Sequence, residues 1–385
     1  MNHAIVDLAR ALAPRLKERA RDAERHRNIP QETVEDLILS GVLKTMIPNR
    51  YGGHQEDWET VAELIMEIAR GDGSQAWVAA VYTMHALDVS MFEEIAQHEI
   101  WGTTPNTLVV SAVAPSGKGK RCEGGAVING RWSFVSGVAY GEWGILGAVI
   151  ADAKSGTPTH HLCLVPADQW TVISNWEVMG LVATGSHDII IENSFVPDHR
   201  IITRIDQREG TAPGTSTHGD LIYATPYLTI GPVALAAVVA GCALGALDEF
   251  ISFTKKRQQR GTPMAERESI QLRIAESAAE ADCARMLLLQ LAESASSNMR
   301  KNGKLTIEER AKARRDTSYA CTLSRRSVER LFETSGAHGL YLNEHFQRYY
   351  RDAKAGSNHI AIGWDRCGST YGRVALGLDP GIDEI

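Results

Sequence analysis

The chain has 385 residues, of which 44% are hydrophobic and 23% are charged, and its formal net charge is −7. This composition excludes a disordered tail, a collagen and a coiled coil, and at about 100 to 200 residues per domain the length predicts two or three domains. The basic residues form no long run, so small molecules or proteins are expected as partners, and nucleic acid is not.

The six cysteines lie far apart, and no two of them have the spacing of a zinc-ligand pair. We therefore predict reduced thiols and no metal site. Residues 1–26 are charged and helix-forming, and they lack the apolar core of a secretory signal. A cytoplasmic location is the expectation that follows.

One stretch, 221–247, contains no charged residue and is long enough to span a bilayer at about 20 residues per crossing. Two prolines and a glycine interrupt its first half, and acidic residues flank both of its ends. The central helix of a soluble bundle, packed on all sides, has the same composition. We expect the bundle helix and no membrane span.

Residues 1–105 repeat apolar side chains at three- and four-residue intervals, which predicts an N-terminal α-helical domain. Over residues 106–215 the pattern changes to short β-like runs separated by Gly, Pro, Asn and Asp, which predicts a compact antiparallel β-domain. At its end, the polar stretch 208–219 is rich in Gly, Thr and Ser and is typical of a linker or mobile loop.

Helical periodicity returns over residues 216–385 and predicts a C-terminal four-helix bundle. Its expected segments are 230–260, 264–301, 306–338 and 343–374. The chain is therefore an α+β protein in which helices, a β-domain and a bundle follow one another.

Standard signatures of catalysis are missing from the sequence. No G-x-G-x-x-G follows a predicted strand, and no P-loop, H-E-x-x-H or G-x-S-x-G occurs. The adjacent His160 and His161 are expected at a strand edge without a metal role. An enzyme with this sequence would take its chemistry from a cofactor that needs no short signature.

Five segments, in this order, resemble the acyl-CoA dehydrogenase fold superfamily, and within it the oxygenase components of two-component flavin-dependent monooxygenases. They are MIPNRYGGHQEDW, ARGDGSQAWV, NGRWSFVSGVAYGEWGILGA, GLVATGSHDIIIENSFVP and YYRDAKAGSNHIAIGWD. The resemblance covers nearly the whole chain. It implies an N-terminal helical domain, a central antiparallel β-barrel and a C-terminal four-helix bundle.

The segment R-D-A-K, residues 351–354, bears on the choice between dehydrogenase and oxygenase. In many acyl-CoA dehydrogenases the proton-abstracting glutamate lies a few residues beyond it, at the position of Ile360 here. No carboxylate occurs between residues 355 and 364, so no local base is present. A dehydrogenase with its base on another helix stays open, although the corresponding region here is the uncharged stretch 221–247.

The resemblance to the oxygenases implies roles for particular polar residues. His359 would lie beside the flavin with Asn358, Ser136 would contact flavin N5, and Ser111 would belong to a loop over the flavin ring. A C4a-hydroperoxyflavin decays once N5 deprotonates, so its site must exclude water and hold hydrogen-bond donors. A histidine and a hydroxyl meet that need with little charge.

The same resemblance implies a substrate site. His85 would bind or deprotonate an aromatic hydroxyl or N–H, with Trp77 on the same helix face and Tyr140 as further substrate contacts. A histidine on an apolar helix face can equally be a core residue whose hydrogen bonds are satisfied within the protein. Likewise, Ser136 can be a turn residue, and His359 can simply follow the end of a helix.

Further residues are implied to bind the flavin. Trp132 and Phe134 precede Ser136 in the W-x-F-x-S-G pattern, and either can instead belong to the β-domain core. Residues 180–186 resemble the family loop G-L-R-G-T-G-S, with Val182 in place of the arginine, so Thr184 and Ser186 are flavin-loop candidates. Arg257, with Arg260 as the alternative, would reach the flavin phosphates of a neighbouring subunit, or would simply be a solvated helix end.

Taken together, the resemblance implies an oxygenase that receives reduced flavin from a separate NAD(P)H-dependent flavin reductase and uses O2 to hydroxylate an apolar, phenol- or indole-like substrate. FADH2 is expected in preference to FMNH2, and a homotetramer is expected from the bundle. An N-oxygenase acting on an amine and a non-catalytic flavin-binding protein remain the alternatives, beside the dehydrogenase.

Overall fold

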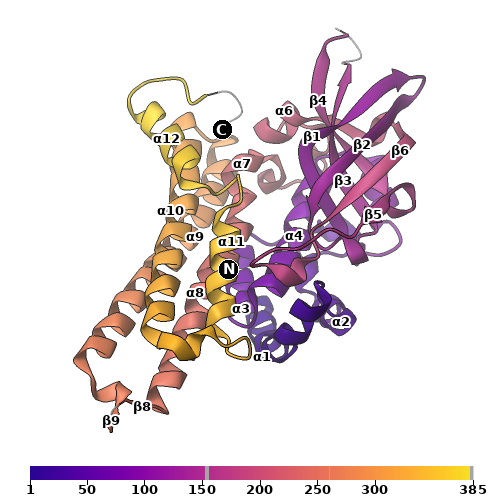
Figure 1. Cartoon of the computed structure of the whole chain (residues 1–385). Helices are drawn as coiled ribbons and strands as arrows, with labels where there is room; N and C mark the ends of the chain where they lie inside the picture. Colours follow the sequence, from indigo (N-terminus) through magenta and orange to yellow (C-terminus); the bar gives the residue numbers. More distant parts are fainter. Residues whose placement is uncertain (152–155, 260, 382–384) are drawn as a thin grey trace.

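The computed structural model describes residues 1–151, 156–259, 261–381 and 385. N-terminal helices lie between a β-sheet and a bundle of long C-terminal helices (Figure 1). This confirms the predicted order of helices, sheet and bundle.

The N-terminal part consists of α-helices joined by short 3₁₀ turns. They are α1 (His3–His26), α2 (Gln31–Ser40), α3 (Trp58–Ala69), α4 (Gly73–Ser90) and α5 (Glu94–Trp101). Helix α4 is buried over its whole length. The Asp72 carboxylate caps it by accepting a hydrogen bond from the Gln75 amide at 2.9 Å. Because every face of α4 is covered, this helix is a rigid rod through the middle of the molecule.

The central sheet has seven strands in the order β5-β6-β2-β1-β3-β4-β7. Their bounds are β1 (Val109–Cys122), β2 (Gly125–Val135), β3 (Trp143–Ala151), β4 (Pro158–Pro166), β5 (Thr171–Ile173), β6 (His187–Pro197) and β7 (Ile201–Thr203). The prediction of an antiparallel barrel was wrong in one respect, because β1 and β3 are parallel. Strand β2 occupies one edge of β1, and the chain crosses through Val138–Tyr140 to add β3 along the other edge.

The polar stretch 208–219 is not the linker that its composition indicated. Helix α6 (Arg204–Glu209) and the 3₁₀ turn Pro213–Ser216 lie in it or at its start. The Arg208 guanidinium is buried and donates to the Ile385 carbonyl at 2.8 Å, and the neighbouring Gln207 amide donates to Asp88 on α4. Tertiary packing holds these residues in place despite their polar composition.

The C-terminal part is helical, with a small hairpin of β8 (Gln258–Gln259) and β9 (Thr262–Pro263) at one end of the bundle (Figure 1). Its helices are α7 (Tyr227–Ile230), α8 (Pro232–Lys255), α9 (Glu268–Asn302), α10 (Ile307–Ser335), α11 (Phe346–Ser357) and α12 (Trp364–Ala375). The expected last segment, 343–374, is therefore two helices. The break at 358–363 is a pair of tight turns in which the His359 amide donates to Gly356 and the Ile362 amide to His359, each at 3.0 Å.

The uncharged stretch lies mostly in one continuous apolar segment, Tyr227–Lys255, which contains α7 and α8. Within the described residues it is the one helical segment long and apolar enough to cross a membrane, and 94% of its most apolar window is buried inside the protein. Helix α8 packs against α3, α4, α9, α10 and α11. The segment therefore has the setting of a core helix, as predicted.

Asp88 provides a prediction about stability. It is 1% exposed on α4, its Oδ1 accepts from Gln207, and its Oδ2 has no hydrogen-bond partner among the described residues. Burial raises the pKa of Asp88 to about 7. The folded state therefore keeps this proton after the unfolded chain has lost it, so the contribution of Asp88 to stability falls as the pH rises from about 4 to about 7.

We expect Asp88→Asn to raise the free energy of unfolding by about 1–3 kcal/mol at pH 8, because an amide carries no charge to bury, with the gain shrinking toward pH 5. Urea unfolding at both pH values measures this difference. Asp168→Asn, at an exposed position, serves as the control and should change little. An equal effect of Asp88→Asn at pH 5 and pH 8 would contradict the prediction.

Candidate active site

Two of the predicted residues, His85 and Ser111, contact each other directly. The His85 Nδ1 atom lies 2.7 Å from the Val109 carbonyl oxygen, and because a carbonyl only accepts, Nδ1 carries the ring proton. The Ser111 hydroxyl lies 2.8 Å from Nε2. Burial lowers the pKa of His85 to about 4, so the ring is neutral at pH 7 and Nε2 accepts the Ser111 proton.

This geometry leaves the Ser111 oxygen free to accept a further hydrogen bond. Ser111 is half-buried, whereas His85 is 2% exposed. A ligand hydroxyl can therefore donate to Ser111 while Ser111 donates to His85. The histidine is satisfied within the core, as the alternative interpretation held, yet it is linked through a single hydroxyl to an accessible position.

A second cluster forms two turns earlier on α4. The Trp77 indole N–H donates to the Ser136 hydroxyl at 3.3 Å, and Ser136 lies 2.8 Å from the Ser186 hydroxyl. Ser186 in turn lies 2.6 Å from the Thr184 hydroxyl. The four residues come from α4, from the end of β2 and from the loop 180–186, so tertiary folding brings Trp77, predicted as a substrate contact, together with three predicted flavin residues.

The segment that follows Ser136 is held by Tyr82 of α4. The Tyr82 hydroxyl donates to the Gly137 carbonyl at 2.6 Å. Gly137 has φ +72°, and a Cβ atom there would lie 2.7 Å from the Tyr82 oxygen. Only glycine fits this close approach, which explains the S-G pair in the sequence.

His359 joins the second cluster from the C-terminal part. Its ring lies edge-on to Trp77, with 5.8 Å between the ring centroids. The His359 Nδ1 atom accepts from the Ala361 amide at 3.2 Å, so the proton of the neutral ring lies on Nε2. His359 is exposed to solvent, and the protein packed around the ring lowers its pKa, so His359 is a neutral donor at pH 7.

Gly356 allows this arrangement. It lies inside α11, and a Cβ atom there would be 3.3 Å from the Trp77 ring and 3.1 Å from Val239. Ser357 is the last helical residue of α11, and Asn358 is its C-cap. Asn358 itself is exposed beside His359.

The loop 180–186 is fixed by a residue that the sequence reasoning missed. Leu181 has φ +53°, and its amide donates to the Asp352 carboxylate of α11 at 2.6 Å. The Leu181 carbonyl accepts from Thr184 and from the Trp176 indole. Burial and the neighbouring Asp72 raise the pKa of Asp352 to about 7. Asp352 is the aspartate of the R-D-A-K segment. The sequence therefore marked this position, but the segment was used only to find where a dehydrogenase carries its glutamate.

Other predicted residues are not brought into these clusters. The prediction for Trp132 was wrong, because this side chain is fully buried in the sheet, where its indole donates to the Gly147 carbonyl at 2.7 Å. Tyr140 is half-buried, and its hydroxyl donates to the Ile29 carbonyl at 3.1 Å. Phe134, in contrast, is 71% exposed and packs edge-on against Trp176, so its ring is available to a ligand.

Arg257 lies beside the β8–β9 hairpin, at the end of α8 away from the sheet (Figure 1). Its guanidinium stacks 4.5 Å from the Phe253 ring centroid. A single chain does not bring Arg257 to the other predicted flavin residues, so any such contact requires a neighbouring subunit. Arg260 lies outside the described residues.

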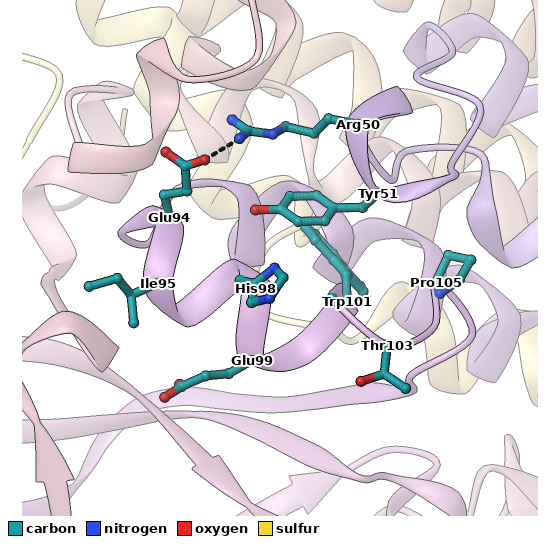
Figure 2. A pocket seen from close by; sticks show the side chains of 10 residues that line it. Arg50, Tyr51, Glu94, Ile95, His98, Glu99, Trp101, Thr103 and Pro105 are labelled. Carbon is teal, nitrogen blue, oxygen red and sulfur yellow. Dashed lines mark hydrogen bonds and ion pairs between the residues drawn. The ribbon is translucent and has the colours of Figure 1, made fainter.

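A surface pocket of about 610 Å³ lies at α5 and the 3₁₀ turn Asn49–Tyr51 (Figure 2). An ion pair between Arg50 and Glu94 borders it, and the Tyr51 and Trp101 rings pack against each other in its wall. Its ten lining residues include none of the predicted site residues. The polar clusters along α4 therefore define the candidate site, and this pocket is separate from it.

The donor set along α4 fits a reduced flavin. Two neutral histidines, the hydroxyl groups and the Trp77 indole offer hydrogen-bonding atoms along α4, and none of these groups is charged at pH 7. Among the described residues, no group of three or more His, Cys, Asp or Glu could hold a metal ion. Such neutral donors and acceptors can hydrogen-bond to the polar edge of a flavin ring.

Comparison with known proteins identifies the fold family. Residues 2–101 match the acyl-CoA dehydrogenase N-terminal domain, and residues 233–364 match an acyl-CoA dehydrogenase C-terminal domain. The fold and the site therefore define a flavoenzyme of the acyl-CoA dehydrogenase fold.

Individual relatives narrow the family. The chain is 32% identical to the oxygenase component of the FADH2-dependent resorcinol hydroxylase of Rhizobium sp. (strain MTP-10005), over 98% of this chain and 95% of that protein. The crystal structure of the HsaA monooxygenase from M. tuberculosis superposes with a TM-score of 0.94 at 31% identity, covering 100% of this chain and 99% of that one. XiaF from Streptomyces sp., solved with FADH2 and glycerol, gives 0.92 at 26% identity, with 99% and 97% coverage.

The chain belongs to the oxygenase components of two-component flavin-dependent monooxygenases. This confirms the family, the reduced-flavin cofactor and the need for a separate flavin reductase. The roles of individual site residues stay predictions.

Proposed function

We propose that this oxygenase hydroxylates a small, largely apolar aromatic substrate that carries a phenolic hydroxyl or an indole-type N–H. The observation that carries the proposal is the Ser111–His85 pair, a buried neutral acceptor linked through one hydroxyl to an accessible position. The names of relatives, such as the resorcinol hydroxylase, support an aromatic substrate. The pair suits a ligand that donates one hydrogen bond.

The pKa values of a phenol and of His85 decide whether His85 removes the substrate proton or only accepts a hydrogen bond from it. A phenol has a pKa of about 10, and the pKa of His85 is lowered to about 4, so complete proton transfer before the reaction would cost about 8 kcal/mol. His85 therefore acts as a hydrogen-bond acceptor that takes up the proton only as the ring gives up electron density. Polarising the O–H bond in this way raises the electron density at the carbon to be hydroxylated.

The residues around Trp77 hold the flavin. When bound, reduced flavin would supply the two electrons that activate O2, and one atom of that O2 would be transferred to the substrate while the other leaves as water. Ser136 and His359 would contact the ring edge with neutral groups, and Trp77 would keep water from the region between them. The Ser186 hydroxyl, itself hydrogen-bonded to Thr184, hydrogen-bonds to Ser136 and holds it in position. We propose FAD as the preferred flavin, with Arg257 of a neighbouring subunit reaching its phosphates in a homotetramer formed through the bundle.

The rival dehydrogenase lacks a base in the places where one is expected. Ile360, at the usual position, is 68% exposed and cannot take a proton. The acidic residues that close the uncharged stretch are engaged elsewhere, since Asp248 pairs with Arg70 and Glu249 pairs with Lys17. These ion pairs argue against a displaced base on α8. A cytoplasmic location suits an enzyme that must meet a diffusing reductase.

The test is to supply chemically reduced FAD or FMN, ¹⁸O2 and a panel of phenol, resorcinol, indole and aniline. Mass spectrometry then detects ¹⁸O in each product. We expect one ¹⁸O atom in the phenols or indole and tighter binding of reduced FAD than of reduced FMN. Oxygenation of aniline alone would point to the N-oxygenase, and anaerobic bleaching of bound oxidised flavin by an acyl-CoA would identify a dehydrogenase and end the proposal.

A further inference from the structure

The hydroxyl groups of Ser136, Ser186 and Thr184 form a chain of hydrogen bonds. The partners at its two ends determine which hydroxyl donates and which accepts in each bond. Thr184 has one hydroxyl proton, and its oxygen lies 2.8 Å from the Leu181 carbonyl, which can only accept. The proton of Thr184 therefore points to Leu181. Leu181 is itself held by Asp352, which fixes this end of the chain.

The position of the Thr184 proton fixes the donor and acceptor roles of Ser186 and Ser136. Ser186 lies 2.6 Å from Thr184, and because the Thr184 proton is committed, Ser186 must donate to it. Ser186 then has only lone pairs left for Ser136, at 2.8 Å, so the Ser136 proton points to Ser186. At the other side, the Trp77 indole N–H can only donate to Ser136.

Ser136 is thus left with one open lone pair and no free proton. All three hydroxyl residues are buried, with exposures of 0% for Thr184, 3% for Ser186 and 9% for Ser136. None of these three hydroxyl groups is exposed to solvent, so none of them can take a second proton donor from water in place of the bonds described. Toward the accessible side, Ser136 can accept a hydrogen bond but cannot donate one.

We propose that Thr184 is a positioning residue that sets the direction of this chain, so that Ser136 presents only an acceptor to the N5 edge of the flavin. This inference rests on the proposed function. Reduced flavin carries a proton on N5 and can donate to Ser136, whereas N5 of oxidised flavin is itself an acceptor. The chain therefore selects the reduced form, which arrives from the reductase, over the oxidised form, which must leave.

The experiment measures dissociation constants for reduced FAD, under anaerobic conditions, and for oxidised FAD. Thr184→Val keeps the shape but removes the acceptor for Ser186, which frees Ser186 to donate toward Ser136 and frees Ser136 to donate to N5. We expect the ratio of the oxidised to the reduced dissociation constant to fall by about tenfold. Thr184→Ser, which keeps the hydroxyl, should leave the ratio unchanged.

A second variant guards against a folding defect. Ser186→Ala removes the acceptor of the Ser136 proton directly and should lower the same ratio by a similar factor. Ser136→Ala reports whether N5 contacts this residue at all. If Ser136→Ala changes the ratio while Thr184→Val and Ser186→Ala, with unchanged melting temperatures, do not, the inference is overturned and the oxygenase proposal stands. If the unmodified protein binds neither form of flavin, the proposed function itself fails.

Discussion

Replacing His85 with phenylalanine is expected to lower the rate of product formation by about 10²–10³-fold while oxidation of reduced flavin continues. The ring would still fill the space on α4, but Ser111 would lose the Nε2 acceptor that lies 2.8 Å away. The electrons from the flavin should then appear as hydrogen peroxide. The measurement is the yield of hydroxylated product and of peroxide for each flavin oxidised.

Two companion variants make this prediction specific. Ser111→Ala should cause a similar loss, and the double variant should be little worse than either, because the two groups act in series. Thr83→Val changes another buried polar residue of α4 and should leave the product yield intact. Additive losses in the double variant would show that Ser111 and His85 act independently.

The pH profile tests the same pair. Because the pKa of His85 is lowered to about 4, the ring stays neutral and able to accept from Ser111 throughout the range above about pH 5. The yield of hydroxylated product per flavin oxidised should therefore be constant between pH 6 and 8 and fall only as the pH approaches 4. A fall centred near pH 6.5, the ordinary value for histidine, would contradict the assignment.

The second large effect is expected at His359. His359→Ala removes a neutral N–H donor beside Trp77, and one such positioned donor contributes about 10²–10³-fold where charge develops in a reaction. We expect the ratio of peroxide to product to rise at least about tenfold, with a smaller change in the dissociation constant of reduced flavin. Product and peroxide yields, together with anaerobic flavin titration, measure both quantities.

The neighbouring Ile360 offers the control, since it is 68% exposed and lies in the same turn. Ile360→Ala should leave the peroxide yield close to that of the unmodified protein. Equal peroxide yields from His359→Ala and the unmodified protein would show that His359 only follows the end of α11.

Short-range patterns predicted much of this molecule. The helical periodicities, the packed uncharged segment and the W-x-F-x-S-G and R-D-A-K segments depend on neighbouring residues, which a sequence displays directly. The parallel pairing of β1 and β3 could not be read, because it depends on which edge of β1 the chain reaches after β2. The W-x-F-x-S-G pattern likewise left two positions open for Trp132, the flavin wall and the β-domain core, and only the structure places it in the core.

Contacts between distant segments account for what was missed at the site. Asp352 holds Leu181 across 171 positions of sequence, and the hydrogen bond between Ser136 and Ser186 spans 50. Neither distance leaves a local signature. The resemblance pointed to Ser136, Ser186 and Thr184 one at a time, but only the fold places their hydroxyls in one chain.

Helix α4 carries both Trp77 and His85, eight positions apart, which is about 12 Å along the axis. Because the helix is buried on all sides, this interval would fix the separation between the proposed flavin site beside Trp77 and the proposed substrate anchor at Ser111 and His85. An aromatic compound would then be accepted or refused by how far its O–H or N–H lies from the carbon to be oxidised. Substituents on the far side of the aromatic ring would matter less. Positional isomers of a substrate should therefore differ more in their rate of hydroxylation than homologues that carry longer side chains.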